Sequence, residues 1–239
     1  MGIFQNSAVI GLFRQERRYE LIANNLSNAQ TPGFKKDSPA FHQIFSEALH
    51  PSLTTSSLDS ETSLPSFRQG EVRHTGNPLD LAIEGEGFLK VKTPSGIRYT
   101  RNGNLRLNRE GVLVQGNGFP VLSRNGEINL RGADKVEVDK DGTIKLNGEN
   151  REKLALVTFA DLKGLLKEGN SLFRLETDQE EKEPEGSQII EGGLEESNVN
   201  TMEEMVQLID ALRTFESCYK IVQVQDEMNA RAVNDLAKI

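Results

Sequence analysis

The chain of 239 residues contains no tryptophan, one cysteine and few aromatic side chains, which make up 6% of it. A single cysteine cannot form a disulfide within the chain, so cysteine usage does not indicate a reducing or an oxidising compartment. That residue, Cys218, lies inside a helical pattern and is expected to be a small packing residue. With so few aromatic residues, we expect a modest hydrophobic core for a chain of this length.

Long apolar runs and basic patches are also missing. No stretch approaches the roughly 20 apolar residues of a membrane-spanning helix, so no membrane insertion is expected. Residues Met1 to Leu12 lack a basic leader and a continuous apolar segment, so a route other than a cleaved secretory signal is expected if the protein leaves the cytoplasm. The formal net charge of -8, without a clustered basic patch, argues against a nucleic-acid partner.

Patterns typical of catalytic, metal and nucleotide sites are weak. His42, His50 and His74 lie in or near one linker, and no Cys or His pair has the spacing of zinc ligands. Asp139-Lys140-Asp141-Gly142 begins like a calcium loop, but its later ligands are missing and a hairpin turn explains it. Gly85-Glu86-Gly87 is followed by no helix, and no nucleophile elbow occurs. We therefore expect no catalytic residue, metal, cofactor or small-molecule substrate.

What the sequence does contain is a helical pattern at each end. Mostly apolar residues recur at alternating steps of four and three, as in the seam of a coiled coil. The first series, within about Gly2 to Ala29, is Ala8, Leu12, Gln15, Tyr19, Ile22, Leu26 and Ala29. The second series is Met205, Leu208, Leu212, Phe215, Tyr219, Val222, Asp226, Asn229, Val233 and Leu236. Two seams predict helices that pair with each other, with other copies of the chain, or both; a seam alone is also compatible with a simple dimer.

The end of the first helix is rich in asparagine and serine. Asn24, Asn25, Ser27 and Asn28 compete with the helical backbone for hydrogen bonds, and Pro32 then stops the helix. A frayed helix end explains these residues from their chemistry alone. The functional alternative is that the three asparagines form hydrogen bonds across subunits or redirect the chain within an assembly.

The second helix has a start signal. Thr201 followed by Glu204 has the spacing of a capping box, so Thr201 is the expected N-cap. From Thr201 to Leu236 the helix would be about 54 Å long. An isolated helix with an apolar seam on one side has little stability in water, so a partner is expected.

Between the helices the pattern changes to strands and turns. Alternating segments such as Leu79–Ile83 and Phe88–Lys92 indicate strands, and Asn147-Gly148 supplies the positive φ of a tight hairpin. Similar turn signals occur at Asn102-Gly103, Glu110-Gly111, Asn117-Gly118, Asn125-Gly126 and Asp141-Gly142. Their spacing indicates an antiparallel β domain of sandwich or barrel type. The acidic stretch Glu176–Gly186 is expected to be a solvated loop.

The predicted fold is therefore α+β. The N- and C-terminal helices pair as an α-helical coiled-coil-like domain, and a central, mainly antiparallel β domain lies between them in the sequence. The expected boundaries are 1–34 for the first helix, 35–69 for a linker, 70–196 for the β-rich domain and 197–239 for the C-terminal helix. The linker assignment rests on residues 51–66, which are rich in Ser, Thr and Pro and lack periodicity.

Three groups of motifs, in order along the chain, are more specific than these patterns. They are ANNLSNAQTPGFK at 23–35; NPLDLAI at 77–83 with Gly87-Phe88 and YTRNG at 99–103; and ESNVN at 196–200 with EEMV at 203–206 and RTFE at 213–216. Together they resemble the signatures of flagellar axial proteins, the rod and hook proteins of the bacterial flagellum. The resemblance covers nearly the whole chain.

The resemblance implies a self-assembling structural protein rather than an enzyme. In this family the terminal helices form an inner helical tube and the β domain decorates the outside. The implied partners are copies of the chain, other flagellar rod proteins and the flagellar type III export apparatus. The implied location is the basal-body rod, which crosses the periplasm and transmits torque from the motor to the hook. The residues expected at subunit interfaces are Leu12, Tyr19, Ile22, Asn24, Asn25, Leu26, Asn28, Met205, Leu208, Leu212, Phe215, Tyr219 and Val222.

Within the family, the segment between Phe34 and Asn77 is short. The sequence QGEV at 69–72 leads directly into TGNP at 75–78, which resembles the proximal rod protein more than the distal one. The distal rod protein stays the alternative. An alternative of another class is a β-domain binding module or adhesin on a coiled-coil stalk, which would form a discrete, closed oligomer and carry a ligand pocket.

Overall fold

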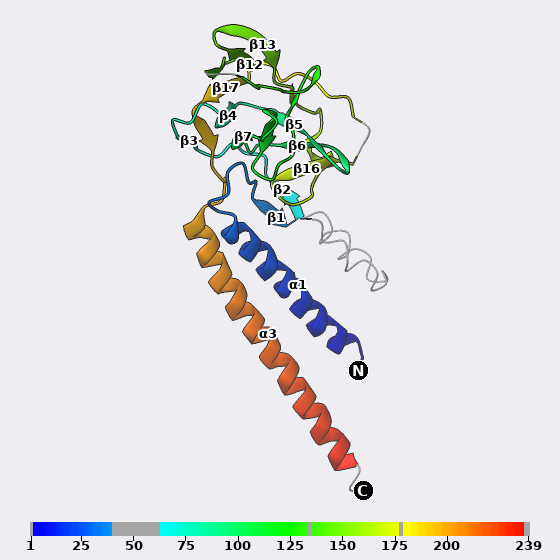
Figure 1. The fold of residues 1–239 in the computed structure, drawn as a ribbon. Helices are drawn as coiled ribbons and strands as arrows, with labels where there is room; N and C mark the ends of the chain where they lie inside the picture. The colour runs from blue at the N-terminus through cyan, green and yellow to red at the C-terminus, as the bar shows by residue number, and fades with distance from the viewer. Residues whose placement is uncertain (1, 40–62, 133–134, 177–178, 237–239) are drawn as a thin grey trace. The chain divides into compact units, whose positions relative to one another are not determined.

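A computed structural model describes residues 2–39, 63–132, 135–176 and 179–236 of the chain (Figure 1). These residues form two compact units. The helical unit ends at Ser27 and resumes at Asn200, whereas the β unit consists of Asn28–Ser38 and Leu64–Val199. Most of the predicted linker lies outside the described residues, as do His42 and His50.

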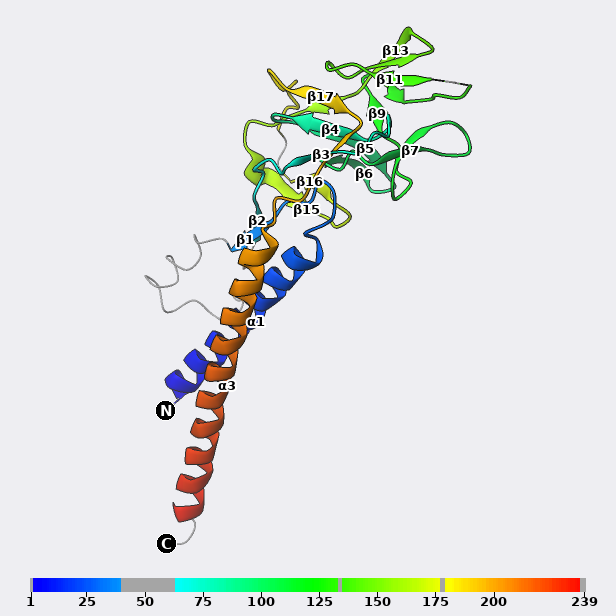
Figure 2. The same cartoon turned by 90° about the vertical axis from the view of Figure 1, so that its left-hand side faces the viewer.

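The helical unit consists of α1 (Gly2–Ser27) and α3 (Thr201–Leu236). The two helices pack against each other and run in opposite directions, and α3 continues beyond the start of α1 (Figures 1 and 2). At the end of α1 the Ser27 hydroxyl donates to the carbonyl oxygen of Asn24, 2.9 Å away. Such side-chain competition for the backbone is the expected behaviour of a polar helix end.

The start of α3 differs from the prediction by one residue. Asn200, not Thr201, is the N-cap, because its Oδ1 accepts from the N–H groups of Met202 at 3.1 Å and Glu203 at 3.3 Å. The carbonyl of Asn200 accepts the first helical hydrogen bond, from Glu204 at 2.9 Å. Asparagine caps a helix at least as well as threonine, so the capping-box spacing selected the wrong one of two adjacent candidates.

The predicted coiled-coil-like pairing of α1 and α3 is wrong. In Figure 2 the two helices cross instead of winding around each other. A coiled coil buries its seam, but Tyr19, Met205, Leu212 and Tyr219 are exposed, while Ala211, outside the series, is buried. Met205 is exposed already near the start of α3, whereas Leu208, Phe215 and Val222 stay half-buried, so the predicted seam is offset from the side of α3 that packs.

The central region is largely β. Its strands are β1 (Asp37–Pro39), β2 (Ser63–Pro65), β3 (Val72–His74), β4 (Leu81–Glu84), β5 (Phe88–Thr93), β6 (Gly96–Thr100), β7 (Leu105–Leu107), β8 (Leu113–Gln115), β9 (Leu122–Ser123), β10 (Gly126–Glu127), β11 (Val136–Val138), β12 (Thr143–Leu146), β13 (Glu149–Lys153), β14 (Leu156–Val157), β15 (Leu165–Lys167), β16 (Leu172–Leu175), β17 (Gln188–Glu191) and β18 (Gly193–Glu195).

The strands of the β unit pair in antiparallel ladders. One sheet has the order β14-β5-β6-β16-β15, another has the order β11-β12-β13, and the remaining strands form two-stranded sheets. Within the first sheet, β5 and β6 pair from Leu89 opposite Thr100 to Thr93 opposite Gly96. The last two strands pair with strands near the start of the central region, β17 with β4 and β18 with β3. The two ends of the β unit are therefore brought together.

The glycines of the predicted turns have two different uses. Asn147 and Gly148 join β12 to β13 with φ values of 51° and 90°, which confirms the predicted tight hairpin. Gly103 does not have a positive φ, so the turn predicted there is wrong. A Cβ at Gly103 would lie 1.7 Å from the carbonyl oxygen of Leu81. Gly103 is required for this close backbone approach.

The core of the β unit has an aliphatic and an aromatic part. The aliphatic cluster includes Leu81, Ile83, Leu89, Val91, Leu113, Val121, Ile128 and Ile144. The aromatic cluster contains Phe88, Tyr99, Phe159 and Phe173, with Phe67 packed against it. The Tyr99 and Phe159 rings are T-shaped at a centroid distance of 4.8 Å, a favourable edge-to-face geometry. Five aromatic residues of the β unit thus pack together.

The acidic stretch before β17 is not simply a solvated loop. Lys182 and Thr158 exchange backbone hydrogen bonds of 2.8 and 2.9 Å. Glu181 accepts from the Tyr99 hydroxyl and from Lys90 Nζ, both at 2.7 Å. These contacts attach the stretch to the β unit, and its residues from Glu180 to Gly186 are mostly exposed and form a loop, as predicted.

Candidate assembly surfaces

The predicted interface residues differ in exposure. Tyr19, Met205, Leu212 and Tyr219 are exposed, Leu12, Leu26, Leu208, Phe215 and Val222 are half-buried, and Ile22 is buried. Leu208, Phe215 and Val222 are seven residues apart and lie on a similar side of α3. Part of the predicted set is thus shielded within the chain, and the rest remains at its surface.

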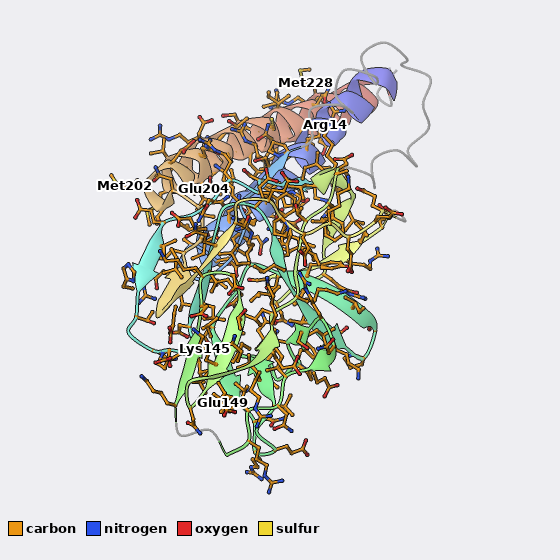
Figure 3. All side chains as sticks on the ribbon, turned by 90° about the horizontal axis from the view of Figure 1, so that it is seen from above. Arg14, Lys145, Glu149, Met202, Glu204 and Met228 are labelled. Atoms are coloured by element: carbon orange, nitrogen blue, oxygen red, sulfur yellow. The ribbon has the colours of Figure 1, made fainter. Side chains whose placement is uncertain are left out.

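The first turns of α3 carry an exposed apolar surface, which we call the α3 apolar face. It consists of Met202, Met205, Val206 and Ile209, whose spacing places them on one side of the helix. Glu204, on a different side, is buried, and Figure 3 shows Met202 pointing outward while Glu204 does not. Contiguous exposed apolar residues mark an interaction site more often than isolated ones do. Sequence reasoning found only Met205, because the others lie outside the heptad series.

A second apolar stripe lies farther along α3. Ile221, Val224 and Met228 are exposed and separated by three and four residues, so they share one side of the helix. Figure 3 shows Met228 on the outside of α3. On α1, Phe13 is exposed as well. The sequence series missed these residues too, since a search for one seam does not detect a second apolar side.

The three asparagines have different surroundings. Asn25 Nδ2 donates to Glu204 Oε2 at 3.3 Å, and both residues are buried, so this contact joins α1 to α3 within one chain. Asn28 Oδ1 accepts from the Thr31 hydroxyl at 3.2 Å, which is a local turn contact. Asn24 is exposed. A role of these residues between subunits stays a prediction.

The β unit contains a buried ionic cluster, which we call the Glu195 junction. Glu195 Oε1 accepts from Lys35 Nζ at 2.5 Å and from the N–H of Gly70 at 3.1 Å, and Oε2 accepts from Arg101 Nη1 at 3.3 Å. The backbone carbonyl of Glu195 accepts from the N–H of Gly33 at 2.8 Å. The side chains of Lys35 and Glu195 are fully buried. One residue thus connects three segments that are distant in the sequence.

Asn198 connects two of these segments a second time. Its Oδ1 accepts from the N–H of Lys36 at 2.7 Å, and its Nδ2 donates to the carbonyls of Ser66 and Arg68, each at 2.8 Å. Lys35 Nζ also donates to the carbonyl of Arg68 at 2.8 Å. The chain that follows α1 and the chain that precedes α3 are therefore held by side chains as well as by strand pairing.

Burial dominates the electrostatics of the Glu195 junction. Desolvation lowers the pKa of Lys35, and the attraction of the Glu195 carboxylate opposes this shift. Burial also lowers the pKa of Arg101, again opposed by Glu195. Arg101 gains further partners, since Nη2 donates to the carbonyl of Gly85 at 2.8 Å and the guanidinium lies over the Phe88 ring. The cluster is closed to solvent, and its chemistry suits holding segments together.

Sequence reasoning did not identify the Glu195 junction as functional. Lys35, Arg101 and Asn198 each lie in a different one of the motifs that carried the resemblance. Those motifs were the only available signal. Nothing in their spacing indicates that the three side chains belong to neighbouring contacts.

Within the described ranges, no group of three or more His, Cys, Asp or Glu side chains gathers as a metal site requires. None of the described helices is both long enough and apolar enough to cross a bilayer. Cys218 is half-buried in α3.

Three protein-family patterns match the chain. "Flagella basal body rod protein" matches residues 6–35, "Flagellar hook protein FlgE/F/G D1 domain" matches residues 82–146, and "Flagellar basal body rod FlgEFG protein C-terminal" matches residues 190–236. The first and last of these ranges include most of α1 and α3, and the middle one lies in the β unit.

Individual relatives are similar over almost their full length. The flagellar basal-body rod protein FlgF of Caulobacter vibrioides is 35% identical, over 98% of this chain and 99% of the relative. FlgF of Salmonella typhimurium is 31% identical, over 89% of each chain. FlgG of Bacillus subtilis is 30% identical, over 95% of this chain and 97% of the relative.

Proposed function

The chain belongs to the family of flagellar basal-body rod proteins, and we propose that it is a structural subunit of the bacterial flagellar rod. The observation that carries this proposal is similarity along nearly the whole length of both chain and relative, so that the helical unit and the β unit are both included. A shared β domain alone would leave the role of the terminal helices open.

The proposed mechanism is polymerisation through the terminal helices. An apolar surface at the start of α3 and another near its end can each dock on a neighbouring subunit. Contacts between different surfaces are heterologous, and when they repeat without closing they build a helical tube. Torque would then be carried by many packed helices. In this scheme the assembly domain consists of residues 1–34 and 197–239, and the outer domain consists of residues 70–196. Residues 35–69 connect the two domains.

The proposed interface keeps the predicted residues and adds the exposed ones. Tyr19, Met205, Leu212 and Tyr219 are exposed and therefore available to a neighbour. The half-buried and buried members, together with Asn24, Asn25 and Asn28, would act by shaping the helix pair or by contacts that form on assembly. Met202, Val206 and Ile209 join the set because they share a side of α3 with Met205.

The family also suggests partners and location. The chain is proposed to assemble with copies of itself and with other rod proteins in the basal body, within the rod that crosses the periplasm. Delivery by the flagellar export apparatus is part of the same proposal. The role is structural, without a catalytic step, a small-molecule substrate, nucleic acid or membrane insertion.

Between the two rod types, we infer the FlgF type. FlgF relatives reach 35% identity and the FlgG relatives 31%, and the short segment between Phe34 and Asn77 favours the same choice. The FlgG type is the second candidate, since several FlgG relatives also match over most of their length. Expression in host strains that lack either FlgF or FlgG separates the two: restored motility only in the strain lacking FlgG would reverse the choice.

The substitution Leu212→Asp tests assembly through the helices. Leu212 is exposed, so the β unit should fold normally, but a carboxylate in an apolar contact should block incorporation into the rod. The measurement is motility, and the content of purified basal bodies, in cells whose only copy carries the change. Ile97→Asp is the matched control, because Ile97 is an exposed apolar residue of β6. Normal motility with Leu212→Asp would reject the helix-mediated mechanism.

A further inference from the structure

The Glu195 junction joins the two ends of the β unit. Its members come from the chain after α1 (Gly33 and Lys35), from Gly70, from the segment after β6 (Arg101) and from β18 itself. Seven residues separate Ser27, the last residue of α1, from Lys35, and five separate it from Gly33, so the held segment is close to the helix in sequence.

Stability alone does not explain a buried ionic cluster at this place. Removing charges from water is unfavourable, and well-packed apolar residues of similar volume often replace a buried ion pair without loss of stability. What an ionic cluster adds is geometry, because a buried carboxylate is satisfied only when each donor lies in one position. The Glu195 carboxylate requires Lys35, Gly70 and Arg101 to be in place at the same time.

The position of the cluster in the chain gives this geometry a consequence. Along the chain, roughly 170 residues lie between the end of α1 and the start of α3, whereas the path through the Gly33–Glu195 contact includes only about a dozen. The probability that two chain segments meet falls with about the 3/2 power of the length between them. Relative to a chain whose central region is unfolded, the shorter path therefore favours pairing of the two helices by about 50-fold.

We propose that the Glu195 junction, supported by Asn198, is a positioning device that holds the end of α1 and the start of α3 at one separation. Glu195, Lys35, Arg101 and Asn198 are then positioning residues that act through the helices. A folded β unit presents the two helices as a pair, ready to meet other subunits. The inference concerns a single chain and does not depend on whether that chain builds a rod.

The test measures the separation directly. Spin labels are attached to cysteines that replace the exposed residues Gln30 and Thr201, in the full chain with Cys218→Ser. Pulsed electron spin resonance gives the distribution of distances between the labels. With an intact junction we expect one narrow distribution. Glu195→Gln and Asn198→Ala should both broaden it, and amide-exchange protection in α1 should fall while protection in β5 stays unchanged.

Two choices of variant keep the test decisive. Asn198→Ala removes hydrogen bonds without leaving a buried charge unpaired, so it decides the result if Glu195→Gln does not fold. Glu181→Gln is the matched control, because Glu181 also accepts from two side chains of the β unit but lies outside the junction. A narrow distribution in the junction variants, a broad one in the unmodified chain, or equal broadening in the control would each overturn the proposal.

Discussion

Replacing Val206 and Ile209 by serine is expected to weaken subunit association without unfolding the chain. Val206 is 67% exposed and Ile209 is 52% exposed, so a neighbour can still cover more than half of each. Full burial of such a side chain contributes about 1.5–3 kcal/mol, so covering the exposed part contributes about 1 kcal/mol for each residue. Losing both should cost about 2 kcal/mol for each contact, or roughly a 30-fold higher dissociation constant.

Serine is the appropriate replacement because its helix propensity is close to that of valine and isoleucine, so α3 itself should be little affected. The assay is sedimentation of the purified full chain over a range of concentrations, with the melting temperature of the β unit as a check on folding. Ile97→Ser, an exposed position of β6, is the control. Unchanged association in the double variant, an equal change in the control, or no association of the unmodified chain would refute the assignment of the α3 apolar face.

Two further predictions concern the β unit. Burial, and then donation of its hydroxyl to Glu181, raise the pKa of Tyr99 above the usual 10.0, so the folded state keeps a proton that the unfolded state loses. The contribution of Tyr99 to the free energy of unfolding should therefore be fully present below pH 10 and fall above it, by up to about 1.4 kcal/mol per pH unit. Urea titrations at several pH values should show this fall in the wild type but not in Tyr99→Phe. Gly103→Ala should destabilise the β unit by at least about 3 kcal/mol, because the new Cβ would overlap the Leu81 carbonyl oxygen. Gly148→Ala should cost only about 1 kcal/mol, because Gly148 has a positive φ but open space around it. Equal effects of the two alanine substitutions in urea titrations would contradict this distinction.

The helices and several turns followed from local chemistry. The series at alternating steps of four and three place α1 and α3, and an Asn-Gly pair specifies the tight hairpin at residues 147 and 148, because both depend on neighbours in sequence. The same reasoning misplaced the N-cap by one residue, since Asn200 and Thr201 are both suitable and only the observed hydrogen bonds decide between them. At Gly103 it mistook a close approach between distant segments for a turn.

The helix partner was harder to predict than the helix. A heptad series does not by itself tell which side of a helix meets its partner: in α3 the alternate members Met205, Leu212 and Tyr219 are exposed, while Ala211, outside the series, is buried. The exposed residues Met202, Val206 and Ile209 lie outside the series, and whether they are covered depends on where the second helix lies. Exposure is therefore a property of the packed pair and not of either segment alone.

The sequence by itself determined the two terminal helices, a β-rich region between them and, through its motifs, the family of flagellar rod proteins. These features depend on local periodicity, turn chemistry and residue identity, all of which are present in the linear chain. Only the tertiary structure decided which side of α3 remains exposed, and that Lys35, Arg101 and Glu195 meet in one buried cluster. Such contacts join residues separated by up to 160 positions, and their geometry exists only after the strands have paired.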